Sequence, residues 1–76
     1  MFRRYKNLGG KSKVLRYEIA KDGMTIKFVD SSVYRYTNQS ADPENIAKMK
    51  ELALAGKGLG TFIDANLKDR FLRKIR

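Results

Sequence analysis

The chain has 76 residues and a mass of 8.7 kDa, which is the size of one small domain. Its 17 lysines and arginines outnumber its 8 aspartates and glutamates, so the formal net charge is +9. Cysteine and histidine are both absent, which excludes disulfides, thiolate or imidazole metal sites and Ser-His-Asp or Cys-His catalysis, so we expect no enzyme activity, no cofactor and no metal site.

The basic side chains gather at the two ends of the chain. Residues 1–13 carry five basic side chains and no acid, residues 14–67 carry seven of each, and residues 68–76 carry five basic and one acidic. Because residues 1–13 also lack a hydrophobic period, we interpret them as a mobile basic arm before a single domain over residues 14–76. Basic ends of this kind contact phosphate backbones, although the same charge would also serve solubility alone.

Two segments near the start of the domain have the pattern of strands. Residues 14–20 alternate between apolar and polar side chains, with Leu15, Tyr17 and Ile19 on one face. This alternation predicts a half-buried strand. Residues 25–29 alternate in the same way and are predicted to form the second strand.

Asp22-Gly23 lies between these segments and is a strong hairpin signal, because glycine accepts the positive φ of a type I′ turn. A two-residue turn at this place pairs Tyr17 with Phe28 and Ile19 with Ile26. Both pairs then lie on the apolar face, so the turn and the alternation agree.

The third predicted strand spans residues 33–37, and the connection before it decides which way Tyr34 and Tyr36 face. A three-residue loop over 30–32 pairs Phe28 with Tyr34 and places both tyrosines on the apolar face, whereas a two-residue loop turns them to the opposite face. We favour the three-residue loop, because it keeps one consistent apolar face. We also expect a positive φ within it, although it contains no glycine.

The triplet Tyr34-Arg35-Tyr36 is the feature that most suggests binding. On an open sheet face, two such tyrosines stack on unpaired bases, whereas on a buried face their rings belong to the core. The register argument favours the core for both rings. Arg35 then lies on the opposite face, in a row with Lys27 and Glu18.

The chain after the third strand shows a clear helix start. Residues 38–41 are expected to form a loop, after which Asp42 is a typical N-cap and Pro43 suits the first helical position. The helix is predicted to run to about Ala55 and to end at Gly56.

The glycine-rich bend over residues 56–60 does not match a Walker phosphate-binding loop. Its glycines follow a helix, and Lys57 is followed by glycine and not by serine or threonine. The end of a helix and a tight reversal of the chain explain these glycines. The alternative is an anion site made of backbone amides beside Lys57.

The C-terminal segment has apolar residues at every fourth position, which predicts a helix. These residues are Ile63, Leu67, Phe71 and Ile75. Residues 67–76 are the firmer part of this helix, and residues 61–65 could instead be extended. The whole pattern predicts the α+β class, with a three-stranded antiparallel meander packed by two helices in the order β-β-β-α-α.

The run Tyr17 … Ile26-Lys27-Phe28 … Tyr34-Arg35-Tyr36, followed by residues 58–67, resembles the KTSC domain. That family has a central Tyr-x-Tyr and a later small-x-Gly-x-aromatic segment, and Tyr34, Tyr36 and Gly60 occupy the matching positions. The resemblance covers about residues 12–72. KTSC domains occur at the C-terminus of some lysyl-tRNA synthetases and alone in small bacterial proteins. The function of the family is not established, and RNA binding is suspected from the synthetase context, so the resemblance implies a small bacterial protein and RNA binding as a hypothesis.

Two functions are compatible with the sequence: non-catalytic binding of RNA or single-stranded nucleic acid through the basic termini, and protein–protein interaction or self-association without nucleic acid. No apolar run approaches the roughly 20 residues of a membrane span. The basic start also lacks the apolar stretch of a signal peptide, so we expect a cytoplasmic protein with no membrane partner. The residues predicted to contact nucleic acid are Arg3, Arg4, Arg16, Tyr34, Arg35, Tyr36, Lys57, Lys68, Arg70, Arg73 and Lys74.

Overall fold

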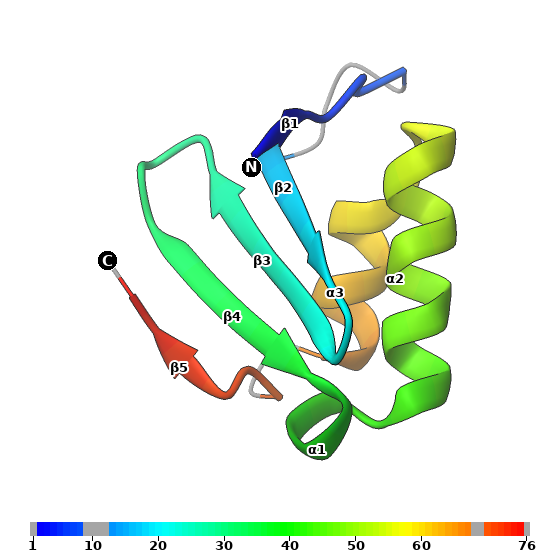
Figure 1. Ribbon diagram of the computed structural model, residues 1–76. Coiled ribbons are helices and arrows are strands. Elements are labelled where there is room, and N and C mark those ends of the chain that lie inside the picture. The colour runs from blue at the N-terminus through cyan, green and yellow to red at the C-terminus, as the bar shows by residue number, and fades with distance from the viewer. Residues whose placement is uncertain (1, 9–12, 68–69, 76) are drawn as a thin grey trace.

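The structure is a computed structural model that describes residues 2–8, 13–67 and 70–75. A five-stranded antiparallel sheet in the order β1-β2-β3-β4-β5 has helices α2 and α3 against one face, and the short helix α1 follows β4 (Figure 1). The elements are β1 Arg3–Arg4, β2 Val14–Ala20, β3 Gly23–Phe28, β4 Val33–Thr37, α1 Asn38–Ala41, α2 Pro43–Ala55, α3 Leu59–Asn66 and β5 Arg73–Lys74. The α+β class and the antiparallel sheet are confirmed, but the three-strand, two-helix order is wrong.

The hairpin of β2 and β3 has a different register from the predicted one. Tyr17 lies opposite Ile26 and Ala20 opposite Gly23, so the turn consists of Lys21 and Asp22. The predicted turn at Asp22-Gly23 is therefore wrong, and the predicted pairing is shifted by two residues. Because side chains alternate with a period of two, this shift leaves the side chains from Arg16 to Phe28 on their predicted faces.

Gly23 serves a close approach between strands and not a turn. It is the first residue of β3 and lies opposite Thr37 of β4. A Cβ added to Gly23 would lie 2.1 Å from the carbonyl oxygen of Tyr36 and 2.8 Å from the Cα of Thr37. Only a residue without a side chain fits there. Tight turns also favour glycine, so the residue type alone does not separate a turn from a close approach of two strands.

A β-bulge in β2 changes which residues face the core. Val14 pairs with Phe28 and Arg16 pairs with Lys27, so Leu15 is an extra residue in β2. Val14 is buried and Leu15 is exposed. The prediction that Leu15 belongs to the apolar face is therefore wrong.

The connection between β3 and β4 keeps both tyrosines on the helix-covered face. Ile26 pairs with Tyr34 and Met24 pairs with Tyr36, which is again a shift of two residues from the predicted register. Ser31 has a φ of 73°, which confirms the expected positive φ in a loop without glycine. Tyr36 is only 2% exposed, so its predicted place in the core is confirmed.

The N-terminal segment is part of the fold. Strand β1 pairs with β2, and Tyr5 is buried in the core with 3% of its surface exposed. The Tyr5 hydroxyl accepts a hydrogen bond of 3.2 Å from the backbone N–H of Leu59. The expectation of a separate arm over residues 1–13 therefore needs correction for its described part, and residues 9–12 lie outside that part.

The segment between β4 and α2 is helical and not a loop. Thr37 caps α1, because its hydroxyl accepts a hydrogen bond from the backbone N–H of Ser40 while the Ser40 hydroxyl accepts one from the Thr37 N–H. This reciprocal pair resembles a capping box with serine in the position where glutamate is usual. The short polar side chains that suggested a loop thus stabilise a single helical turn.

Helix α2 has the predicted bounds. It begins at Pro43 and ends at Ala55, followed by Gly56 in the left-handed conformation with a φ of 76°. Asp42 precedes the helix but its side chain makes no capping hydrogen bond. Its carboxylate instead forms an ion pair with the guanidinium of Arg70, with 3.3 Å between N and O.

The C-terminal helix predicted over residues 67–76 is wrong. Helix α3 ends at Asn66, and the chain returns to the sheet as β5 beside β4 (Figure 1). Ile63 and Leu67 are buried, whereas Ile75 is 49% exposed. The four-residue spacing therefore spans two different elements and does not mark one helix face.

The core fills the space between the sheet and helices α2 and α3. Its largest fully buried side chains come from β2, β3, α2, α3 and the residue after α3, and they are Met24, Ile26, Ile46, Met49, Leu59, Leu67 and Val14. In the described part of the chain, no helix has the length and apolarity needed to cross a membrane.

Candidate nucleic-acid interface

The sheet face turned away from α2 and α3, here called the outer face, gathers one basic side chain from each of the five strands and so forms one basic surface. In the register, Arg4 lies opposite Arg16, which lies opposite Lys27. One row along, Arg35 lies opposite Arg73. Directly opposite residues point to the same side of a sheet with Cβ atoms only about 5 Å apart.

The row of Arg4, Arg16 and Lys27 is electrostatically unfavourable within the protein. Like charges directly opposite one another on neighbouring strands destabilise a sheet. An anion bound across the row would relieve this repulsion, because it would neutralise several cations at once.

A hollow of about 610 Å³ opens on the outer face, and three of its cations, Arg16, Lys27 and Arg35, line it. Most of its apolar lining is exposed to solvent, with Phe2 at 38% and Ile75 at 49%, whereas Val33 is buried. Leu15, turned outward by the bulge, and Val33 complete this lining. The outer face therefore combines a basic surface with an apolar floor.

Two acidic side chains moderate the charge of this surface. Asp22 forms an ion pair with Arg35, with 3.3 Å between N and O. Glu18 lines the hollow beside Thr25. Five basic side chains against these two acids leave the outer face positive.

The structure brings together four of the residues predicted to contact nucleic acid: Arg4, Arg16, Arg35 and Arg73. Sequence reasoning did not include Lys27 or Phe2 among them. Lys27 could have been found from its predicted place on the same face as Arg35, although the two lie in neighbouring rows and not in one row as predicted. Phe2 reaches the face only because β1 joins the sheet, and two residues carry no pattern that predicts this pairing.

The other predicted contact residues lie elsewhere. Arg3 lies opposite Tyr17, which faces the core, and Lys57 follows α2. Arg70 pairs with Asp42, and the Lys74 ammonium lies 5.7 Å from the centre of the Tyr34 ring. Tyr34 and Tyr36 are on the helix-covered face, so they do not join the outer face, and Lys68 lies outside the described residues.

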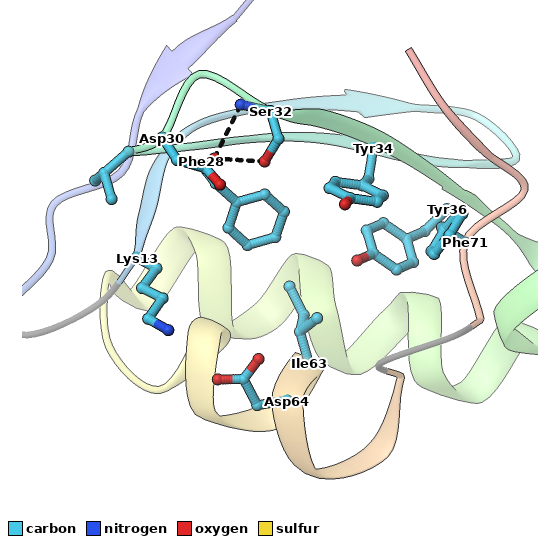
Figure 2. A pocket seen from close by; sticks show the side chains of 10 residues that line it. Lys13, Phe28, Asp30, Ser32, Tyr34, Tyr36, Ile63, Asp64 and Phe71 are labelled. Carbon is cyan, nitrogen blue, oxygen red and sulfur yellow. Dashed lines mark hydrogen bonds between the residues drawn. The ribbon is translucent and has the colours of Figure 1, made fainter. Parts of the chain in front are cut away.

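A second hollow, here called the aromatic pocket, lies on the helix side of the sheet (Figure 2). It has a volume of about 620 Å³ and opens between β3, β4 and α3. Its lining is aromatic on one side, with charged groups at the rim. The residues are Lys13, Phe28, Val29, Asp30, Ser32, Tyr34, Tyr36, Ile63, Asp64 and Phe71.

Two titratable groups of the aromatic pocket have shifted pKa values. Burial raises the pKa of Tyr36 to about 12, and the nearby Tyr34 and Asp64 add to this shift. Hydrogen bonds from the hydroxyl and the backbone N–H of Ser32 lower the pKa of Asp30 below its usual value. The Asp30 carboxylate is therefore already engaged, whereas the Tyr36 phenol stays neutral at ordinary pH.

The raised pKa of Tyr36 predicts a loss of stability in strong base. An unfolded tyrosine releases its proton near pH 10, whereas folded Tyr36 keeps it until about pH 12, so the unfolded state binds fewer protons between these values. Stability should fall across this window by up to about 1.4 kcal/mol per pH unit. Urea unfolding at several pH values measures the slope, and Tyr36→Phe should reduce it. An equal slope in both proteins would contradict the assignment.

No family model, curated protein or solved structure matches the chain, so the resemblance to the KTSC domain stays a prediction. Among the described residues, no group of three or more acidic, cysteine or histidine side chains is placed to hold a metal ion.

Proposed function

We propose that this protein binds single-stranded nucleic acid, RNA in the first place, through the outer face of its sheet. The observation that carries the proposal is the row of Arg4, Arg16 and Lys27, three cations placed directly opposite one another on adjacent strands. A phosphate backbone laid across the strands meets these cations in succession. Binding then releases counterions from the strand and relieves the repulsion within the row.

The apolar hollow favours a single strand over a duplex. A duplex presents mainly phosphates to a flat surface, whereas a single strand can also turn an unstacked base toward an apolar floor. Phe2 offers a ring at that floor, next to Leu15 and Val33. Base stacking on one aromatic ring contributes about 1–3 kcal/mol and tolerates any base, so we expect weak sequence preference at this face.

The double variant Arg16→Gln, Lys27→Gln tests the proposal. It should bind a short single-stranded RNA about tenfold more weakly in a fluorescence anisotropy titration. The dependence of log Kd on log salt should also become shallower by about 1.4, since each lost phosphate contact on a single strand removes about 0.7. Because a repulsive pair has been removed, the variant should unfold at the same or a slightly higher urea concentration.

The matched control removes the same charge from the helix side, as Lys48→Gln, Lys57→Gln. Both lysines are exposed and neither lies on the outer face. The control should bind RNA within about twofold of the unmodified protein, apart from the general effect of net charge. Equal losses in the two double variants would mean that affinity follows total charge, and the proposed site would be refuted.

Self-association through a sheet edge is the competing hypothesis. It requires an edge strand that can pair with a second chain, and both edges here are strands of two residues. Each edge is also made entirely of cations, Arg3–Arg4 on one side and Arg73–Lys74 on the other. Short, charged edge strands are the usual way in which proteins prevent such pairing, so we favour nucleic-acid binding.

A further inference from the structure

The aromatic pocket keeps its rings in place by contacts among the rings themselves. Tyr34 packs edge to face against Phe28 with ring centres 5.6 Å apart, and against Phe71 with ring centres 4.8 Å apart. Phe71 also packs at 86° to the ring of Tyr36. Phe28, Tyr34 and Phe71 nevertheless remain only partly buried. The pocket is thus a preformed aromatic wall with surface left to cover.

Ile63 of α3 faces this aromatic wall across the hollow (Figure 2). A space bounded by rings on one side and an aliphatic side chain on the other suits a flat, apolar-faced molecule. Its volume of about 620 Å³ lies within the usual range for small-molecule sites and would hold a nucleoside.

The polar groups at the rim specify which flat molecule fits. The Asp64 side chain extends from α3 into the hollow toward the end where Lys13 lies, and the Tyr36 hydroxyl points into the same hollow from β4 (Figure 2). Asp64 and Tyr36 line the same pocket, and the charge of Asp64 adds to the raised pKa of Tyr36, after burial and Tyr34. Within the described part of the chain, the Asp64 carboxylate has no hydrogen bond or ion pair, whereas the Asp30 carboxylate is engaged by Ser32. Asp64 is therefore the carboxylate left to accept from a ligand.

We propose that the aromatic pocket binds a nucleobase with adjacent N–H donors on its edge, guanine above all. The ring stacks against the aromatic wall, and the carboxylate of Asp64 accepts hydrogen bonds from the base edge. Uracil is disfavoured, because its single ring N–H lies between two carbonyl oxygens that a carboxylate repels. Lys13 at the rim offers an ammonium to a phosphate attached to the nucleoside.

This site is distinct from the outer face, because it lies on the opposite side of the sheet. It extends the proposed function without depending on it. The base could belong to a free nucleotide or to a bound strand, and both present the same ring to the pocket.

A ¹H–¹⁵N titration with guanosine 5′-monophosphate and uridine 5′-monophosphate tests the site. The guanine nucleotide should shift the amides of Tyr34, Ile63 and Asp64, with an affinity about tenfold above that of the uracil nucleotide, as expected for one charge-assisted hydrogen bond. No shift at these residues, or equal affinity for the two nucleotides, would overturn the proposal.

Asp64→Asn is the decisive variant, and Glu51→Gln is its matched control. Both residues are exposed carboxylates on helices, so neither substitution should prevent folding. Asp64→Asn should lower the affinity for the guanine nucleotide about tenfold, and Glu51→Gln should leave it unchanged. Phe71→Leu should lower the affinity for both nucleotides by the same factor, because it removes ring surface and no hydrogen bond. Equal affinities for Asp64→Asn and Glu51→Gln would refute the role of Asp64.

Two further titrations distinguish a base that belongs to a bound strand from one in a free nucleotide, and distinguish the pocket from the outer face. If a bound strand supplies the base, a uridine oligonucleotide with one guanosine should bind more tightly than oligouridine, and Asp64→Asn should abolish the difference. If only free nucleotides enter the pocket, the two oligonucleotides should bind with equal affinity, while the guanine mononucleotide should still bind more tightly than the uracil mononucleotide. Either result supports the pocket. The variant Arg16→Gln, Lys27→Gln should keep binding guanosine 5′-monophosphate. A negative result for RNA binding at the outer face would therefore not refute nucleotide binding in the pocket.

Discussion

Gly23→Ala is expected to lower the free energy of unfolding by about 3 kcal/mol, as measured by urea unfolding followed by circular dichroism. A Cβ at this position would lie 2.1 Å from the carbonyl oxygen of Tyr36, which is a backbone atom and cannot rotate away. Strand β4 would have to move from β3, and the movement would disturb the pairing of Gly23 with Thr37. The loss follows from this clash and not from backbone strain, because Gly23 is not among the glycines with positive φ.

Gly58→Ala provides the control for Gly23→Ala. Gly58 has a φ of 84°, but an added Cβ would make only an ordinary contact of 3.7 Å with the Leu52 side chain. Its substitution should therefore cost about 1 kcal/mol, the strain of a left-handed alanine. A loss at Gly23 no larger than the loss at Gly58 would contradict the close approach of the strands and would favour the turn at Asp22-Gly23.

Leu67→Ala is expected to cost about 3 kcal/mol, because this side chain is fully buried and its loss would leave a cavity between α3 and the sheet. Leu72→Ala should cost under about 0.5 kcal/mol, since Leu72 is 52% exposed. The pair tests where the apolar face of α3 ends. Similar losses at the two positions would contradict the return of the chain to the sheet after Asn66.

The elements that could be predicted are those with strong local signals. The bounds of β2, β4 and α2 follow from alternation, from Pro43 at a helix start and from Gly56 at a helix end. The faces of Tyr34 and Tyr36 were also predictable, because a register error of two residues does not change a face.

The elements that could not be predicted depend on contacts between distant residues. β1 and β5 each contain two cations and have no hydrophobic pattern, so only their pairing with the sheet makes them strands. The bulge at Leu15 likewise follows from pairing with β3. The C-terminal spacing of apolar residues was misleading, because tertiary packing divides it between α3 and the segment leading to β5.

The composition predicted that a candidate site would be basic, but it did not predict which face of the fold carries the charge. Counting charge along the chain located the basic ends and made residues 14–67 look neutral. In the fold, Arg16, Lys27 and Arg35 from that neutral stretch share a face with Arg4 and Arg73 from the ends. Counting charge along the sequence does not detect a basic surface that forms only when the strands pair.

Binding of a single strand by the outer face is best tested by a ¹H–¹⁵N titration with a short single-stranded RNA at about 150 mM salt. We expect the largest shifts on Arg16, Lys27 and Arg35, with smaller shifts on α2. Shifts confined to α2 around Lys48, or shifts of equal size at every lysine and arginine that vanish with a modest rise in salt, would contradict it.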